Sequence, residues 1–153
     1  MQDRFKFRYV FTKDFGGKTG ICYKMPIFNL DTITDENFNK IVKSYIDYDY
    51  KLISMEQSTG LKDKNGKLIY EGDIISVKIK TQDVFNVEEY YSENYKGEII
   101  FKEGEFAIRV IDTKKQPISL YYYANGCEII GNIYENPELL EVTNKIKENK
   151  EWK

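Results

Sequence analysis

Alternating apolar and polar positions dominate the middle of the chain, and clusters of turn residues separate the short apolar runs. A helical period occurs in only two places. This pattern predicts a mainly β protein built of strongly bent antiparallel sheets, with an N-terminal extension and a C-terminal helix.

Two segments carry the helical period. From Asp35 to Ile46, apolar residues recur at positions i, i+3, i+4 and i+7, and Thr34 precedes them as an N-cap. We expect this helix to cover a sheet. The second helix is predicted to begin at Asn136, a cap residue followed by proline at the first helical position, and to reach about Asn149.

Two hairpins follow from turn residues and register. A two-residue turn at Glu103-Gly104 pairs Phe101 with Phe106, Ile99 with Ile108 and Glu98 with Arg109. A type I′ turn at Asn125-Gly126 pairs Tyr122 with Ile129 and Tyr121 with Ile130. The second pairing is apolar on both faces, so we expect residues 120–124 to be buried in the core or at an interface.

The stretch from Thr59 to Ile79 is the most patterned in the chain. Asp63 and Gly66 suit the first and fourth positions of a type I turn that contains Asn65, and Gly72 permits the positive φ of a sharp redirection. A strand over 74–80 follows. The tyrosine- and acid-rich segment 81–96 has no clean period and is predicted to be a long loop.

Composition bounds the class of protein. The 153 residues are 41% apolar, which is enough for one core, and 23 basic residues against 25 acidic ones leave a net charge of −2. No basic footprint for DNA or anionic lipid stands out. No apolar run exceeds five residues and the start lacks a hydrophobic segment, so we expect a cytoplasmic protein without a membrane span. Cys22 and Cys127 are expected to be free thiols.

The absence of histidine removes Ser-His-Asp and Cys-His catalysis as well as the common zinc motifs. Residues 16–20 lack the glycine spacing of a phosphate-binding loop. The acidic pairs Glu71 with Asp73 and Glu103 with Glu105 flank turn glycines, where carboxylates are usually solvated. We therefore expect no enzymatic activity, no metal and no cofactor.

Aromatic residues offer a different kind of site. Tyr121, Tyr122 and Tyr123, near Arg109 and two lysines at 114 and 115, would form a stacking platform for nucleic acid, or they would pack in the core or at an interface. The acidic balance of the chain favours packing, so nucleic acid is the weaker alternative.

Two long motifs resemble a known family. Residues 57–74, with Thr59-Gly60-Leu61, Asn65-Gly66 and Tyr70-Glu71-Gly72-Asp73, look like the signature of YopX-type proteins of bacteriophages and prophages. Residues 129–140, Ile-Ile-Gly-Asn-Ile-Tyr-Glu-Asn-Pro-Glu-Leu-Leu, are similar to the family's C-terminal motif. The start, Phe5-Lys6-Phe7-Arg8, also fits, although Tyr9-Val10 replaces the Trp-Asp that commonly follows.

The resemblance implies a small SH3-like barrel, a phage origin, a location in the cytoplasm of the bacterial host and no established activity. No catalytic residue carries over. We expect a β/α segment at 1–56 that packs on the barrel, a barrel core at 57–135 with a loop insertion at about 81–96, and a C-terminal helix at 136–153.

Three functions remain open. The first is a non-enzymatic, self-associating protein-interaction module that contacts a phage or host protein, since the chain is rich in strands, carries 13 tyrosines and lacks catalytic groups. The second is a nucleic-acid-binding barrel. The third is an inhibitor of a host defence system that uses the acidic segment 83–93 to mimic nucleic acid.

Overall fold

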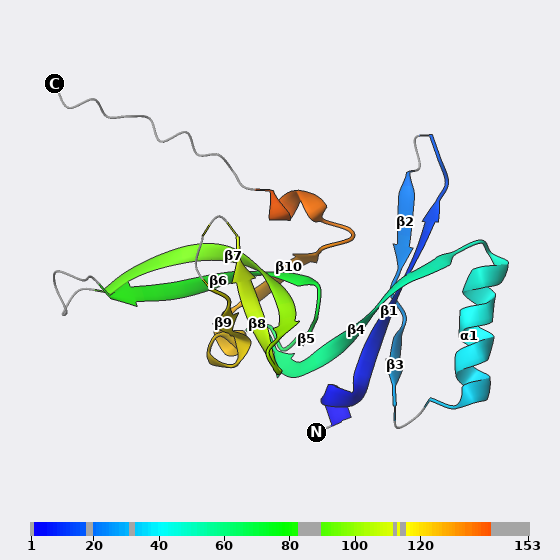
Figure 1. The fold of residues 1–153 in the computed structure, drawn as a ribbon, viewed down its shortest axis with the longest axis horizontal. Coiled ribbons are helices and arrows are strands. Elements are labelled where there is room, and N and C mark those ends of the chain that lie inside the picture. The colour runs from blue at the N-terminus through cyan, green and yellow to red at the C-terminus, as the bar shows by residue number, and fades with distance from the viewer. Residues whose placement is uncertain are drawn as a thin grey trace.

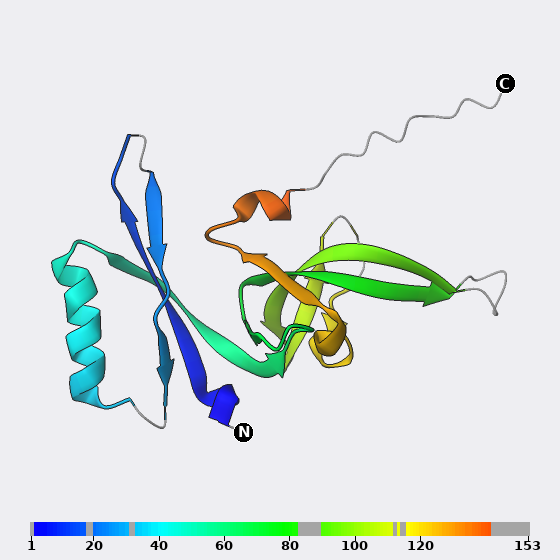
Figure 2. The same ribbon diagram turned by 180° about the vertical axis from the view of Figure 1, so that it is seen from behind.

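Over the residues that the structure describes, the protein is mainly β, with two antiparallel sheets and one short α-helix (Figures 1 and 2). The computed structural model describes residues 2–17, 20–30, 33–82, 90–111, 113 and 116–141. The strands are β1 (Lys6–Asp14), β2 (Ile21–Lys24), β3 (Ile27–Asn29), β4 (Lys51–Lys62), β5 (Leu68–Tyr70), β6 (Asp73–Gln82), β7 (Tyr90–Lys102), β8 (Glu105–Val110), β9 (Ile118–Ser119) and β10 (Glu128–Asn132). The helix is α1 (Asp35–Asp47), and 3-10 turns occur at η1 (Gln2–Phe5), η2 (Leu120–Tyr122), η3 (Ala124–Gly126) and η4 (Pro137–Leu140).

The N-terminal sheet has the order β2-β1-β4-β5, and β3 pairs with β1 beside β2. Helix α1 covers its face that points away from the second sheet (Figure 1). The prediction of this helix is confirmed, and the Thr34 hydroxyl accepts a hydrogen bond from the backbone N–H of Asn37 at 3.2 Å. Phe38 packs edge-on against Tyr9, and Tyr45 stacks on Phe11, so the helix buries the aromatic face of β1.

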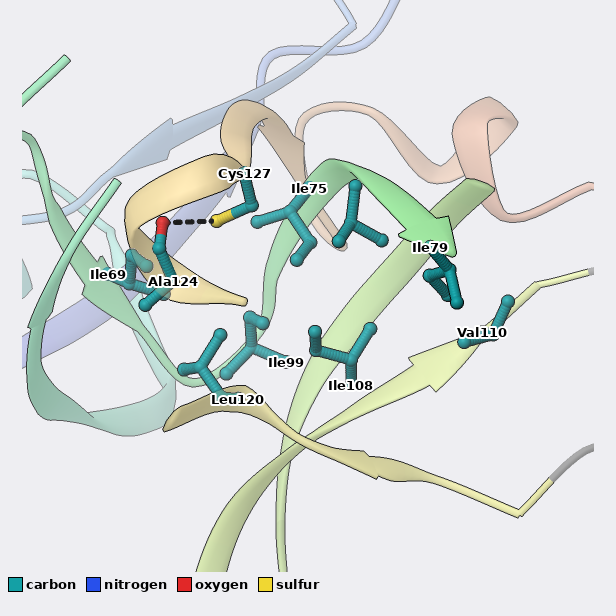
Figure 3. Packing of buried hydrophobic residues seen from close by; sticks show 10 residues of the cluster. Ile69, Ile75, Ile79, Ile99, Ile108, Val110, Leu120, Ala124 and Cys127 are labelled. Atoms are coloured by element: carbon teal, nitrogen blue, oxygen red, sulfur yellow. Dashed lines mark hydrogen bonds between the residues drawn. The ribbon is translucent and has the colours of Figure 1, made fainter. Parts of the chain in front are cut away.

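The second sheet, with the order β10-β6-β7-β8-β9, curls into a half-barrel (Figure 1). Its concave side holds the main core, which includes Ile75, Val77 and Ile79 of β6, as their alternation predicts. The other members shown in Figure 3 include Ile69, Ile99, Ile108, Val110, Leu120, Ala124 and Cys127. Strand β4 extends toward the half-barrel, because it pairs with β1 in its first half and with β5 in its second, and Ile69 of β5 belongs to the main core. It therefore crosses the predicted domain boundary at 56/57.

The β7–β8 hairpin has the predicted register. Phe101 faces Phe106, Ile99 faces Ile108 and Glu98 faces Arg109. The turn residues Glu103 and Gly104 have φ of 53° and 87°, as a primed two-residue turn requires. The prediction from cross-strand matching is therefore confirmed.

The loop predicted at 81–96 is wrong over most of its described length. Strand β6 continues to Gln82, β7 begins at Tyr90, and their pairing extends from Ile74↔Glu98 to Gln82↔Tyr90. Ser92, Glu93 and Asn94 are all exposed, because this part of the ribbon extends beyond the core. An exposed two-stranded ribbon needs no apolar face, which is why the sequence lacks an alternating signal there. Residues 83–89 lie outside the described residues.

The hairpin predicted at Asn125-Gly126 is wrong. The segment forms the two successive turns η2 and η3, and β10 pairs with β6 rather than with residues 120–122. Gly126 does not have the positive φ that a type I′ turn requires. Leu120 and Ala124, four residues apart, are both buried. Residues at this spacing lie on the same side of a turning chain, so the turns η2 and η3 bring both side chains to the core.

The C-terminal helix predicted from Asn136 is wrong where the chain is described. Pro137–Leu140 forms a single 3-10 turn, and Glu141 is already extended, with φ −69° and ψ 131°. The remainder of the predicted helix, residues 142–153, lies outside the described residues. No helix of the described part of the chain is long and apolar enough to cross a membrane.

Gly72 forms the corner between β5 and β6, with φ of 80°. Its N–H donates to Ile99 O at 2.9 Å and its carbonyl accepts from Ile133 N at 3.0 Å. A Cβ at this position would lie 2.2 Å from Glu56 Oε1. The corner therefore needs glycine for two reasons, the backbone conformation and the close approach of a buried carboxylate.

These two reasons are separable by mutation. Gly104 also has a positive φ, but a Cβ there would meet nothing within 4 Å. We expect Gly104→Ala to cost about 1 kcal/mol of unfolding free energy from backbone strain alone, and Gly72→Ala to cost at least about 1 kcal/mol more. Urea unfolding of both variants measures the difference. Equal losses would show that the contact with Glu56 has no energetic weight.

Candidate functional site

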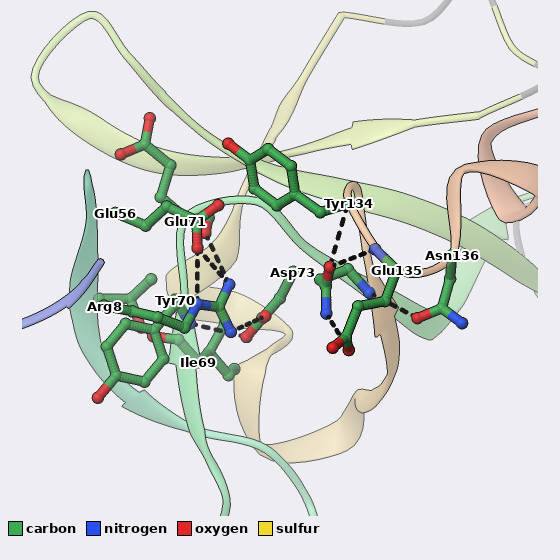
Figure 4. A network of polar contacts seen from close by, with 11 residues as sticks. Arg8, Glu56, Ile69, Tyr70, Glu71, Asp73, Tyr134, Glu135 and Asn136 are labelled. Atoms are coloured by element: carbon green, nitrogen blue, oxygen red, sulfur yellow. Dashed lines mark hydrogen bonds and ion pairs between the residues drawn. The ribbon is translucent and has the colours of Figure 1, made fainter. Parts of the chain in front are cut away.

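A buried ion cluster lies between the two sheets, centred on Arg8 of β1 (Figure 4). Its Nε donates to Glu56 Oε2 at 2.6 Å, Nη1 donates to Asp73 Oδ1 at 2.7 Å, and Nη2 donates to the Glu71 carbonyl at 3.2 Å. The guanidinium also lies 5.0 Å from the centre of the Tyr70 ring. The three charged side chains are between 3% and 11% exposed, so the cluster is shielded from solvent.

Local structure brings these groups together. Arg8 and Glu56 are cross-strand partners of β1 and β4, so their side chains leave the same face of the N-terminal sheet. Asp73 follows the Gly72 corner, and its second oxygen accepts the Tyr70 N–H at 2.9 Å. In the pairing of β1 with β4, the register shifts between Val10 and Phe11. Arg8 lies before this shift, and the residues of β1 that pair with β2 lie after it.

Glu56 is incompletely satisfied. Its Oε2 accepts the bond from Arg8, whereas Oε1 is buried and has no hydrogen-bond partner among the described residues. A cavity of about 130 Å³ adjoins this carboxylate. It is lined by Ser54, Met55, Glu56, Glu71, Gly72, Glu98, Ile99, Ile100, Ile133 and Tyr134. Three of these residues are glutamates, so the cavity is polar and acidic on several sides.

Two carboxylates share one guanidinium, and this sets the electrostatics of the cluster. Burial raises the pKa of Glu56 to about 7, against the opposing attraction of Arg8. Burial also raises the pKa of Asp73, although Arg8 and the Tyr70 N–H favour its ionised form. Glu56 therefore exchanges its proton near neutral pH.

Two turns that are closed by hydrogen bonds from backbone N–H groups to a side-chain oxygen support the site. Asn132 Oδ1 accepts the N–H groups of Tyr134 and Glu135 at 3.0 and 2.9 Å, which holds Tyr134 beside the cavity. Asp63 Oδ1 accepts the N–H groups of Asn65 and Lys67, both at 2.9 Å, and Oδ2 accepts that of Ile129 at 3.1 Å. Burial alone would raise the pKa of Asp63, but these backbone bonds lower it. The Asp63–Gly66 turn is thus attached to β10.

The tyrosines singled out from the sequence differ in their surroundings. Tyr121 and Tyr122 are 73% and 80% exposed and contact each other edge-on, while Tyr123 packs against the core. Arg109 is ion-paired with Glu98 on β7. Lysines 114 and 115 lie outside the described residues. Tyr122 and Tyr123 line an open hollow of about 400 Å³ together with Val77, Lys78, Lys80 and Gly126.

The acidic pairs considered for metal lie in different surroundings. Within the described ranges, no group of three or more Asp, Glu or Cys side chains has a suitable arrangement. Asp73 is held by Arg8, and Glu103 lies exposed at its hairpin turn. Cys22 and Cys127 are free, and burial raises the pKa of Cys127 to about 11, so this thiol is a packing group.

Sequence patterns did not reveal the ion cluster. Arg8 and Asp73 stand inside motifs that drew attention for other reasons, and Glu56 stands just before one. No alternation of apolar and polar residues around Glu56 marks its side chain as buried. Its partner could be identified only after β1 and β4 were paired.

The raised pKa of Glu56 predicts a pH dependence of stability. Because the folded state raises the pKa of Glu56 from its ordinary 4.5 to about 7, its contribution is fully present below about pH 4.5 and is lost as the pH rises through 7. Glu56→Gln keeps an acceptor for Arg8 without the charge. Wild-type protein should therefore lose on the order of 3 kcal/mol relative to this variant between about pH 5 and about pH 8.

Urea unfolding at both pH values provides the measurement, and Glu103→Gln, which removes an exposed charge, is the control. Parallel stability profiles for wild type and Glu56→Gln would contradict a proton held at Glu56.

Comparison with known proteins places the chain in a family. The profile of the YopX protein family matches residues 20–141, which is most of the chain. A crystal structure of protein EF1440 from Enterococcus faecalis is similar at 23% sequence identity, with a TM-score of 0.41, over 89% of this chain and 97% of that one. No curated protein matches the sequence. The chain belongs to the YopX protein family.

Proposed function

We propose that this YopX family protein is a non-enzymatic interaction module that self-associates through the open edge of β4. The supporting observation is a pair of apolar side chains on that edge. Leu52 and Met55 are cross-strand partners of Phe11 and Tyr9, so they point to the face that α1 covers. They remain 46% and 54% exposed, which shows that the helix does not cover this edge.

The backbone of the edge is also available. Among the described residues, β4 pairs with β1 on one side, and β5 pairs with it on the other only from Ser58 onward. The stretch 51–55 thus presents hydrogen-bonding groups beside apolar side chains, a combination suited to addition of another strand. A second copy of this chain offers the same edge, so two copies would pair antiparallel with twofold symmetry.

The resemblance to phage and prophage proteins supports a role in the cytoplasm of the bacterial host, where a phage or host protein would be the further partner.

Light scattering coupled to size-exclusion chromatography tests self-association. We expect wild-type protein to elute with twice its chain mass of 18.1 kDa, and the double variant Leu52→Lys with Met55→Lys to elute as a monomer, because charge on the edge opposes strand pairing. Phe101→Lys, at a residue of similar exposure on the half-barrel, is the matched control and should remain dimeric. A monomeric wild type would overturn the proposal.

A second candidate function, binding of single-stranded nucleic acid, is favoured by the hollow beside β6. Tyr122 offers an exposed ring, and Lys78 and Lys80 are exposed cations on the same hollow. Rings flanked by cations are the usual platform for unpaired bases. The overall charge of −2 opposes this function, so any affinity must come from this local arrangement.

Fluorescence anisotropy with an oligonucleotide of about ten nucleotides tests this candidate. If it is right, Tyr122→Ala should weaken binding by roughly 5- to 100-fold, and affinity should fall with added salt. Tyr48→Ala, at another exposed tyrosine in the loop after α1, should have no effect. Binding that is absent, or equal in both variants, removes the candidate.

A further inference from the structure

The cavity between the two sheets has walls from four segments. Ser54, Met55 and Glu56 come from β4, Glu71 and Gly72 from the corner before β6, residues 98–100 from β7, and Ile133 and Tyr134 from the chain after β10. Its volume of about 130 Å³ is enough for a small polar group with a few waters.

A buried acceptor lies beside this space. Glu56 is 3% exposed, and its Oε1 has no partner. The position of Oε1 is fixed independently by Gly72, since a Cβ built on that glycine would lie 2.2 Å from it, and Gly72 itself lines the cavity. A buried carboxylate oxygen without a donor is costly, so a donor from outside the described side chains would be stabilising.

The nearby cations are already engaged. Arg8 donates to Glu56 Oε2, to Asp73 and to the Glu71 carbonyl, and Arg109 is paired with Glu98. Asp73 is also satisfied by the Tyr70 N–H. Around the cavity, four carboxylates therefore face two guanidinium groups, and the unpaired acceptor coincides with the excess negative charge.

We propose that this cavity binds a primary ammonium or guanidinium group, with Glu56 Oε1 as the anchoring acceptor. Such a group supplies both the missing hydrogen-bond donor and the missing positive charge. A metal ion is a poorer occupant, because the described carboxylates do not converge as a ligand set. The ligand is either the end of a basic side chain from a partner or a free small amine. This inference does not depend on self-association.

Proton binding competes with this ligand. The charged and titratable groups around Glu56 are Arg8 from β1, Tyr70, Glu71 and Asp73 from the corner, Glu98 from β7 and Tyr134 after β10. Since burial holds the pKa of Glu56 at about 7, the carboxylate is ionised above that pH and neutral below it. Binding should therefore be strong at about pH 8 and weak at about pH 5.5.

Thermal unfolding of the full chain in methylammonium chloride tests the proposal, with tetramethylammonium chloride at the same concentration as the matched salt. The second cation has the same charge but no N–H group. At about pH 8 and about ten times the dissociation constant, methylammonium should raise the Tm by roughly 3–6 °C, and tetramethylammonium should not. The rise should disappear at about pH 5.5.

Two variants localise the response. Glu56→Gln should abolish the rise, whereas Glu103→Gln, which removes an exposed charge at the β7–β8 turn, should retain it. If Glu56→Gln does not fold, Glu71→Gln provides a second variant, with a smaller rise expected. No rise with methylammonium up to about 100 mM, an equal rise with both salts, or a rise unchanged by these cavity variants would overturn the proposal.

Discussion

The burial of Arg8 between Glu56 and Asp73 is the interaction on which the arrangement of the two sheets depends. One guanidinium contacts strands from both sheets and the corner that connects β5 to β6. Removing one partner from a buried ion cluster typically costs about 3–5 kcal/mol, because the remaining charge is left uncompensated. The cluster therefore specifies how the sheets meet, while apolar packing on either side supplies most of the stability.

The same junction links structure to candidate function. Because β5 pairs with β4 only from Ser58 onward, the first half of β4 keeps an open side among the described residues. Because two acids share one cation, an unpaired oxygen faces a cavity at the place where all the segments meet. Both features involve the long strand β4, which pairs with β1 in its first half and with β5 in its second.

Sequence reasoning succeeded where the determinants are local. The Thr34 cap and the spacing of Phe38 and Tyr45 define α1 within a few residues. The β7–β8 register follows from matching residues across a two-residue turn. Reasoning failed where the same local signal fits two structures. Asn125-Gly126 resembles a hairpin turn, but the burial of Leu120 and Ala124 favours 3-10 turns. The cap at Asn136 resembles a helix start, but the Asn136 side chain instead bonds Asn132 N across a turn.

The sequence by itself determined the β character, the positions of α1 and of the β7–β8 hairpin, the glycine corner at Gly72 and the absence of histidine chemistry. These features depend on neighbouring residues or on composition alone. Only the tertiary structure decided that Arg8 meets Asp73, 65 positions away, and that Glu56 lies buried with one oxygen unpartnered. The reason is physical: the sequence alone does not show that a charged residue in a strand is buried, because burial results from the pairing that places it between two sheets. The energy of the buried charge then depends on the local dielectric constant and on its partners there.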